Sequence, residues 1–399
     1  MQLHRNVHFG SLRPPRCRCR CYRADSDALG GNVQNRLVGL DFWRAILLLY
    51  GVLLHTAGRI RAMPDDPWIF GVIQSLSRAT RMQAFFLIAG YLAAASISKK
   101  QPMDWLRSRT AQLLIPFFVV WLTFQRFTDL IRKGDFFATP FNIDHLWFLI
   151  VLMSFSLLTV AGKCTAAGKL LSQAARELRR LPLASVIAGM VAAVFAGMLL
   201  NQYIYAAFPA VGMKEGNYES LYLLSRACVM IVFYAVGHVL YKADLLDRVR
   251  AAPLFAVAAV AMALYLMLYD PETYTVRQIT GIPNAVTKIA TYFLYSVIGT
   301  FFSLAIFIHA RSITRISKNT AYLSRAAYTI YLVHIFYVAA AFQVLSTILH
   351  DHYLLFIGTV MLATAGSLAT HQIISMVPLL RLLFNGKLPR TRQAKPSFA

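Results

Sequence analysis

The sequence predicts an all-α polytopic membrane protein with about ten transmembrane helices, both termini cytoplasmic and no separate soluble domain. Of the 399 residues, 58% are hydrophobic and only 14% are charged. Soluble domains are about half apolar and about a quarter charged. The mean hydropathy of +0.54 also fits a membrane protein.

Apolar runs are the second observation behind this class. A helix needs about 20 apolar residues to cross the hydrocarbon core of a bilayer. Ten runs of roughly this length occur, at residues 40–58, 69–97, 111–130, 146–162, 182–200, 222–241, 252–269, 290–310, 326–348 and 353–377. Each run is therefore expected to form one span, with consecutive spans crossing in opposite directions.

The distribution of positive charge is the third observation. The net charge is +23, and 28 of the 40 Lys and Arg residues lie on the N-terminal side of the ten-span arrangement. Eight lie in or beside the loops of the other side, and four lie inside spans: Arg44, Arg78, Arg81 and Arg226. Basic residues beside spans favour the cytoplasm. The pattern predicts cytoplasmic termini and makes a nucleic-acid partner unnecessary.

The parts outside the spans are short. Residues 1–35 are polar and Arg-rich and are expected to form a disordered basic cytoplasmic tail. The cysteines of this tail alternate at positions 17, 19 and 21 without a nearby fourth ligand, a poor zinc pattern. Residues 36–380 form the expected membrane domain, and 381–399 a basic cytoplasmic C-terminal tail. No loop is long enough to fold alone, so an active site must be assembled from helices and short loops.

The first run carries three polar side chains on one helical face. Arg44 and His55 are eleven residues apart, a spacing that returns to within about 20° of the starting direction on an α-helix. They are about 16 Å apart along the axis, and Asp41 shares the face. Ionisable groups inside spans usually mark a site or pathway. Snorkelling is the alternative, and it accounts for Asp41 and Arg44 better than for His55.

The second run adds two arginines toward its outer end. Arg78 and Arg81 are three residues apart and share a face, at a depth comparable with His55. Snorkelling accounts well for Arg78 but less well for Arg81, which lies more than two turns inside the run. A buried guanidinium needs an anionic partner, either a ligand group or a carboxylate such as Asp144.

Two further runs contribute candidate groups. The fourth begins at Asp144 and His145, a possible base with its orienting carboxylate; ordinary loop polarity, with Trp147 as an interfacial anchor, is the alternative. The ninth carries Tyr331 and His334 near mid-membrane, where a histidine can act in catalysis or bond across helices. No GxSxG elbow, HExxH pair, P-loop or dinucleotide fingerprint occurs. We therefore expect neither a metal site nor ATP-driven transport.

Five stretches, in chain order, resemble the acyltransferase family three of integral membrane enzymes. The matching positions are Arg44 and His55 with the preceding Asp41, then residues 81–91, 145–149, 330–334 and 377–387. Two positions depart from the family pattern: Ala89 stands where a serine is usual, and Gln112 where a further basic residue is common. Five ordered matches over residues 36–388 are far more specific than the Arg–His pair alone.

The resemblance implies a membrane O-acyltransferase of the branch that modifies periplasmic glucans with succinyl groups. The implied donor is cytoplasmic acyl-CoA, expected to be succinyl-CoA, and no cofactor is expected to be tightly bound. The implied acceptor is a hydroxyl of a periplasmic glucan or another envelope glycan. The implied location is a bacterial inner membrane, with the lipid bilayer as the surrounding partner.

The donor and the chemistry are assigned to different residues. Arg107, Arg109 and Arg44 are expected to bind the anionic coenzyme A near the cytoplasmic face. His55 is expected to act as general base or as a transient acyl carrier, and either role needs a neutral imidazole.

The remaining candidates have supporting roles. Arg81, with Arg78, is expected to stabilise the oxyanion or to pair with the distal carboxylate of a succinyl group. Asp41, Arg44, His145 and His334 are further catalytic candidates. Arg78, Trp147 and Tyr331 are expected to bind substrate.

Two rival functions remain open. The first is O-acetylation of lipopolysaccharide, capsule or another envelope glycan. Many such relatives carry an added extracytoplasmic domain, which this sequence does not show, and this favours the glucan branch. The second rival is a non-enzymatic transporter of acyl donors or glycans. Internal repeats, typical of many transporters, are not visible in the sequence.

Overall fold

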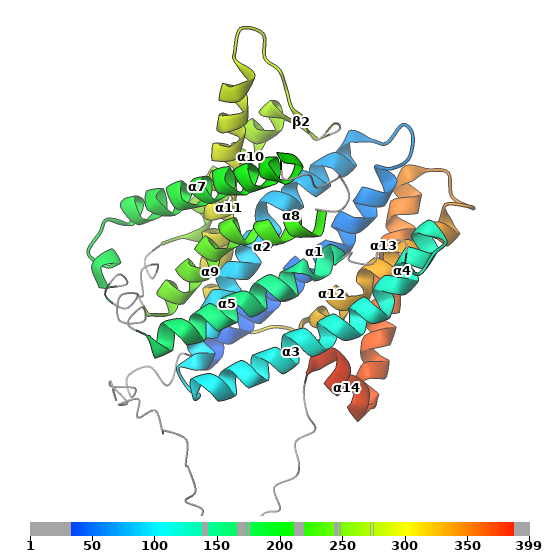
Figure 1. The fold of residues 1–399 in the computed structure, drawn as a ribbon, viewed down its shortest axis with the longest axis horizontal. Helices are drawn as coiled ribbons and strands as arrows, with labels where there is room; N and C mark the ends of the chain where they lie inside the picture. Colours follow the sequence, from blue (N-terminus) through cyan, green and yellow to red (C-terminus); the bar gives the residue numbers. More distant parts are fainter. Residues whose placement is uncertain are drawn as a thin grey trace, which may run out of the picture. The chain divides into compact units, whose positions relative to one another are not determined.

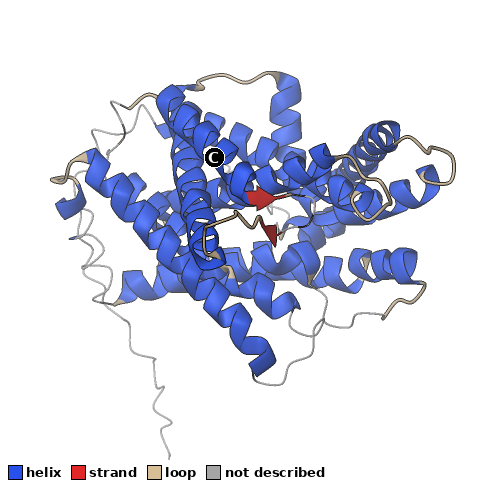
Figure 2. Ribbon diagram, turned by 90° about the horizontal axis from the view of Figure 1, so that it is seen from above, coloured by secondary structure: helices blue, strands red, loops and turns tan. Residues whose placement is uncertain are grey.

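The computed structural model describes residues 33–137, 143–165, 173, 176–210, 219–242, 246, 249–271, 273 and 275–386. Within these residues, ten helical segments are long and apolar enough to cross a membrane. The predicted number of spans and the all-α class are confirmed. The same residues contain one small antiparallel sheet, in which β1 (Tyr269–Asp270) pairs with β2 (Thr275–Val276) (Figure 2).

Seven of the ten spans are single helices and three are composite (Figure 1). The single helices are α1 (Val33–Ile60), α2 (Trp68–Ile97), α7 (Leu183–Ala210), α10 (Ala251–Leu268), α11 (Asn284–Ser312), α12 (Lys318–Leu345) and α13 (His352–Met376). The composite spans are α3 (Pro102–Leu122) with α4 (Phe124–Lys133), η1 (Asp144–Leu146) with α5 (Trp147–Cys164), and α8 (Glu219–Ser225) with α9 (Ala227–Lys242). A short helix, α14 (Pro378–Asn385), follows the last span.

Each composite span has a local cause. Thr123 ends α3 with φ −117° and ψ −87°, and its hydroxyl donates to the carbonyl oxygen of Val119 at 2.6 Å. Arg226 separates α8 from α9. Asp144 begins η1 with φ +33°, in the left-handed region that aspartate tolerates better than most residues. The breaks at Arg226 and Asp144 both lie at the cavity described below.

Helix α2 lies at the centre of the helical unit. Its most apolar window is 72% buried, the largest share among the described spans. It packs against α9 and α11 and also contacts α3 and α5. The backbones of α2 and α9 touch at Gly90, where a β-carbon would overlap the carbonyl oxygen of Tyr234. Close approach at small residues is a common way for membrane helices to associate.

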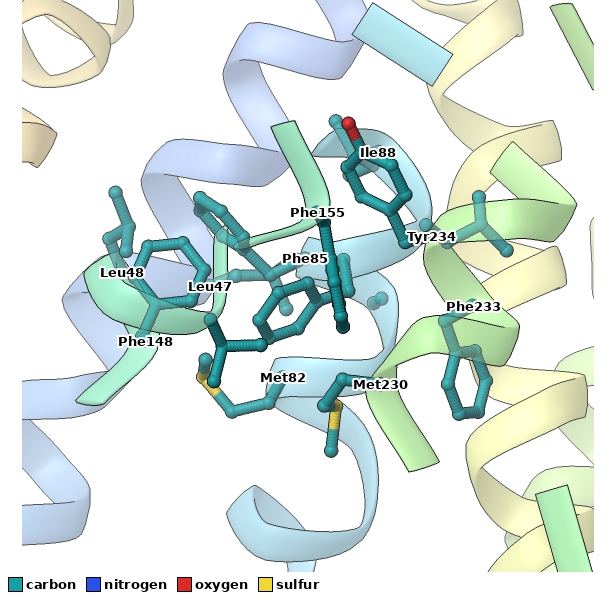
Figure 3. Packing of buried hydrophobic residues seen from close by; sticks show 14 of the residues in the cluster. Leu47, Leu48, Met82, Phe85, Ile88, Phe148, Phe155, Met230, Phe233 and Tyr234 are labelled. Atoms are coloured by element: carbon teal, nitrogen blue, oxygen red, sulfur yellow. The ribbon is translucent and has the colours of Figure 1, made fainter. Parts of the chain in front are cut away.

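An apolar cluster joins α1, α2, α5 and α9 (Figure 3). The ring of Phe85 meets the ring of Phe148 edge-on, with centroids 4.7 Å apart. Phe155 lies 5.2 Å from Tyr234 in the same cluster, and Leu47 enters it from α1. These contacts fix the relative positions of the helices that carry most of the candidate residues.

The predicted tails fall largely outside the described residues. Contacts divide the chain between Gln34 and Asn35, and the described residues from Asn35 onward belong to one compact unit. Of the predicted N-terminal tail, only residues 33–35 are described. Of the predicted C-terminal tail, residues 381–385 belong to α14, which packs on α3 and α13. The domain boundaries at 35 and 380 stay predictions.

Candidate active site

A cavity of about 1410 Å³ opens between the spans at one end of the helical unit. We call this the cavity end; α1 and α10 end there, and α2 and α11 begin there. Its lining includes Arg59 on α1, Gln74 on α2 and Asn284 on α11. The cavity therefore faces the membrane surface opposite the one at which α1 begins.

Three histidines from three spans meet at this cavity. The ring centroid of His334 on α12 lies 5.2 Å from those of His55 on α1 and His145 on η1. The rings of His55 and His145 are 6.4 Å apart. His55 and His145 line the cavity, whereas the side chain of His334 is completely buried against them. The structure thus brings together three candidates that the sequence could only place on separate spans.

The hydrogen bonds of His334 define which of its ring nitrogens carries hydrogen. Its Nδ1 lies 2.8 Å from the carbonyl oxygen of Tyr331 and 3.1 Å from that of Ile330. Carbonyl oxygens only accept, so Nδ1 is the donor and Nε2 of the neutral ring carries the lone pair. Within the described residues, Nε2 is buried without a partner. The ring therefore holds an unused acceptor beside His55.

His145 is held in the opposite tautomer. Its Nε2 lies 3.2 Å from the carbonyl oxygen of Leu332, which makes Nε2 the donor and leaves the lone pair on Nδ1. Nδ1 is buried and has no partner among the described residues. The hydroxyl of Tyr331 donates to the backbone carbonyl of His145. Tyr331 thereby fixes the turn that presents the imidazole, a role that its position in the sequence did not reveal.

Arg81 reaches the histidines across α1. A β-carbon placed on Gly51 of α1 would lie closer than 3.0 Å to Nη1 of Arg81 and 3.4 Å from Nε2 of His334. Nε of Arg81 is buried and has no hydrogen-bond partner in the described part of the chain. The guanidinium is therefore placed beside the imidazoles because α1 has a glycine at this level.

Arg226 is a site residue that the sequence analysis missed. Its guanidinium carbon lies 5.4 Å from the ring centroid of Trp147, and both residues line the cavity. It also interacts electrostatically with Arg81. The backbone carbonyl of Arg226 accepts hydrogen bonds from Val229 and Met230 at the start of α9. The sequence signal that could have identified Arg226 as a site residue is a positively charged side chain inside an apolar run.

Positive charge exceeds negative charge in the cavity. Eight Lys or Arg side chains and three aspartates belong to its lining. Each aspartate has an arginine nearby: Asp144 and Arg132 are 3.4 Å apart, Asp129 and Arg126 3.4 Å, and Asp270 and Arg277 3.7 Å. Asp144, which the sequence offered as a partner for Arg81 or an orienting group for His145, thus pairs with Arg132.

Arg78, the arginine predicted to bind substrate, lies beside a group of tyrosines. Its carbonyl oxygen accepts from the hydroxyl of Tyr295 at 2.6 Å. Tyr265 stacks on Tyr269 with centroids 4.9 Å apart, and all three tyrosines line the cavity. Aromatic faces and hydroxyl groups therefore form part of the cavity wall.

Besides the buried His334, four predicted residues do not line this cavity: Asp41, Arg44, Arg107 and Arg109. Arg44 instead pairs with Asp41 at 3.0 Å. Arg107 is 81% exposed and lies 4.0 Å from Asp104, whereas Arg109 turns over the ring of Trp105 at 5.3 Å. Arg109 also interacts electrostatically with Arg44. Arg44 and Arg109 thus form a second basic group, away from the histidines.

Aromatic side chains separate the two groups. The guanidinium of Arg44 lies 6.0 Å from the ring of Phe85, which packs on Phe148. Phe148 in turn lies 5.5 Å from Tyr331, next to His145. The stripe predicted on α1 is therefore polar at both ends and crosses an aromatic layer in the middle.

The described residues contain no group of three His, Cys, Asp or Glu side chains arranged to hold a metal ion. The three imidazoles of His55, His145 and His334 are therefore not arranged to hold a metal ion. Two of the rings keep a buried nitrogen without a partner among the described residues, and all three lie within 6.4 Å of one another by their centroids.

Comparison with known proteins identifies the family. A family model described as an acyltransferase domain matches residues 37–375, which include all eleven predicted site residues. The chain belongs to the acyltransferase-3 family. It is therefore a multi-pass membrane acyltransferase, and the resemblance predicted from the five motifs is confirmed.

Curated relatives of this acyltransferase match over nearly their whole length. The chain is 24% identical to glucans biosynthesis protein C of Salmonella paratyphi A, Salmonella agona (strain SL483) and Salmonella dublin. Each alignment covers 89% of this chain and 96% of the relative. No solved structure matches the chain.

Proposed function

We propose that this acyltransferase moves an acyl group, expected to be succinyl, from acyl-CoA to hydroxyl groups of a periplasmic glucan. The observation that carries the proposal is the meeting of His55, His145 and His334 at a polar cavity, with Arg81 beside them. Acyl transfer to a sugar needs a group that takes the hydroxyl proton and positive charge near the developing oxyanion. The imidazoles supply the first, and Arg81 supplies the second or pairs with a distal carboxylate of the acyl group.

His55 is the proposed general base. A sugar hydroxyl oxygen attacks the thioester carbonyl carbon while its proton passes to the neutral imidazole. The carbon–sulfur bond then breaks, and the coenzyme A sulfur leaves as a thiol after taking up that proton. The rings of His145 and His334, with centroids 6.4 Å and 5.2 Å from that of His55, are proposed to orient its imidazole or to share the proton.

The second possibility is that His55 carries the acyl group itself. An imidazole nitrogen would attack the thioester carbonyl carbon, the carbon–sulfur bond would break, and the coenzyme A sulfur would leave as a thiol with the proton lost by the acylated imidazole. The sugar hydroxyl oxygen would then take the acyl group, and its proton would return to the imidazole. The two routes share the same residues and differ in whether an acylated enzyme forms.

Charge distribution supports an orientation with the cavity toward the periplasm of a bacterial inner membrane. The side of the ten-span arrangement that holds the N-terminus carries 28 of the 40 Lys and Arg residues, which favours the cytoplasm. Arg44 and Arg109 then face the compartment that contains acyl-CoA and are proposed to bind its phosphates. The pantetheine arm would extend from them through the aromatic layer toward His55.

The acceptor proposal rests on two observations. The curated relatives are named for glucan biosynthesis, and the cavity combines tyrosine faces with amide and hydroxyl groups such as Gln202 and Thr291. A cavity of about 1410 Å³ is also larger than a simple alcohol or a free acyl group needs. A section of an oligosaccharide would fit these properties.

Purified protein in detergent, labelled succinyl-CoA and free periplasmic-type glucan test the proposal. We expect succinylated glucan, detected by mass spectrometry, together with release of free coenzyme A thiol. The His55→Ala enzyme is expected to lose this activity. The His350→Ala enzyme is the matched control, because His350 is exposed and lies outside the cavity lining.

Three results would contradict the proposal. Transfer only to another envelope glycan would replace the acceptor. Movement of glycan or donor that requires a sealed membrane, without acyl transfer, would point to transport. Near-normal transfer by a folded His55→Ala enzyme would remove His55 from the reaction.

A further inference from the structure

Arg81 and Arg226 lie at the same level of two adjacent helices. The α2 and α9 backbones touch where Gly90 meets Tyr234. Arg81 precedes Gly90 by nine residues and Arg226 precedes Tyr234 by eight. Both spans run in the same direction, so each arginine is about 12–14 Å from the contact along its helix, toward the cavity. The two arginines therefore lie at one level of adjacent helices, and their guanidinium groups interact electrostatically.

Local structure holds Arg226 in this position. The residue occupies the break between α8 and α9, and its carbonyl oxygen caps α9. Ser225 next to it accepts from the amide of Asn201 and donates to the carbonyl of Tyr222 at 2.7 Å. Its guanidinium lies over Trp147, a cation–π arrangement that fixes the direction of the planar group.

These two cations have no carboxylate of their own in the described part of the chain. No ion pair of 4.0 Å or less in the described residues contains Arg81 or Arg226. The three cavity aspartates pair instead with Arg132, Arg126 and Arg277. Two like charges in a partly buried site repel each other and lose hydration. An anionic ligand group bound between them would relieve both costs.

We infer that Arg81 and Arg226 form a carboxylate subsite that selects dicarboxylic acyl groups, with the distal carboxylate bound between the two guanidiniums. The inference rests on the proposed acyl transfer at His55. The position fits a short acyl chain: Arg81 borders His334, and Trp147 beneath Arg226 follows His145 by two residues. A four-carbon diacid can therefore place its thioester carbonyl at the histidines and its free carboxylate at the arginines.

Two donors of equal chain length isolate the carboxylate. Succinyl-CoA and butyryl-CoA differ by a carboxylate in place of a methyl group. The full-length purified protein is assayed with each donor and free glucan, and kcat/KM is compared. Wild type should prefer succinyl-CoA. Arg226→Gln should lower kcat/KM for succinyl-CoA by about ten- to a hundredfold, as expected for loss of a charge-assisted hydrogen bond, and should lower kcat/KM for butyryl-CoA much less, so that the succinyl-to-butyryl ratio falls.

Further variants separate recognition from general charge effects. Arg226→Lys should keep part of the preference, because it keeps the charge but loses the planar fork. Lys288→Gln removes one positive charge from the exposed rim of the same cavity and should leave the succinyl-to-butyryl ratio unchanged. Butyryl transfer by Arg226→Gln also reports that the variant is folded.

The outcomes distinguish this inference from the proposed function. Equal losses with both donors, an unchanged ratio in Arg226→Gln, or an equal fall of the ratio in Lys288→Gln would overturn the subsite. Wild-type transfer of butyryl as efficient as that of succinyl would also overturn it while leaving acyl transfer intact. Failure of wild type to modify glucan with either donor would overturn the proposed function itself.

Discussion

Gly51 on α1 and Arg81 on α2 approach so closely that a methyl group on the glycine would collide with the guanidinium. Gly51 lies within the apolar stretch between Arg44 and His55, four residues before the histidine. The absence of a side chain there allows the cation to reach the imidazoles from a neighbouring helix.

Gly51→Ala is expected to displace Arg81 without changing any charge. Nη1 is the far end of a flexible side chain, so the helices can remain packed while the guanidinium moves. Misplacement of a positioned catalytic group by about 1 Å can cost about a hundredfold in rate, and we expect a loss of about tenfold or more in kcat/KM.

The control for this variant is Gly189→Ala on α7, where a β-carbon meets nothing within 4 Å. Thermal unfolding in detergent should be similar for both variants, and only Gly51→Ala should lose activity. Equal activity in the two proteins would show that Arg81 is not held in position through Gly51.

His334→Asn tests whether the free Nε2 matters. The asparagine amide can keep the donor that Nδ1 provides to the carbonyls of Ile330 and Tyr331, but it has nothing at the Nε2 position. If Nε2 shares the proton with His55, transfer should fall by about 10²-fold or more while the protein stays folded.

A matched variant is His371→Asn. The ring of His371 bonds Thr329 at 3.0 Å through Nδ1 and lies outside the cavity lining. We expect this protein to keep its transfer rate. Full activity in His334→Asn would reduce His334 to a structural bond within α12.

Asp144 is expected to contribute through its backbone as well as its charge. Its φ of +33° is easier for Asp and Asn than for Ala, by about 1–2 kcal/mol. The partly buried pair with Arg132 adds up to about 1 kcal/mol. Asp144→Ala should therefore lower the free energy of unfolding more than Asp144→Asn, measured by denaturant unfolding in detergent. The same loss in both variants would assign the whole effect to the ion pair.

Arg107 and Arg109 provide a test of the donor site. Both were predicted to bind coenzyme A, but Arg107 is exposed beside Asp104 and Arg109 turns inward toward Arg44. Arg109→Gln should raise KM for acyl-CoA by about tenfold, the loss of one charge-assisted hydrogen bond. Arg107→Gln should have a much smaller effect, because its guanidinium is solvated. A larger effect at Arg107 would place the phosphates on the outside of α3.

Residue patterns along the chain determined the membrane class, the ten spans and the family. These properties depend on local quantities: run length sets whether a segment can cross a bilayer, and the five motifs are contiguous or lie on one helix. The helical period also placed Arg44, His55 and Asp41 on one face. The predicted borders were less accurate where polar helix extends beyond the apolar run, as at Pro102, where α3 begins nine residues before position 111.

Tertiary structure alone decided which of these side chains meet. His55, His145 and His334 are far apart in the chain, and only the packing of α1, η1 and α12 brings their rings together. The same holds for Arg226, whose direction depends on a one-residue break between two helices. Periodicity orients a side chain on its own helix, but the helix that stands opposite is set by interhelical packing, such as the contact at Gly90 that aligns α2 with α9.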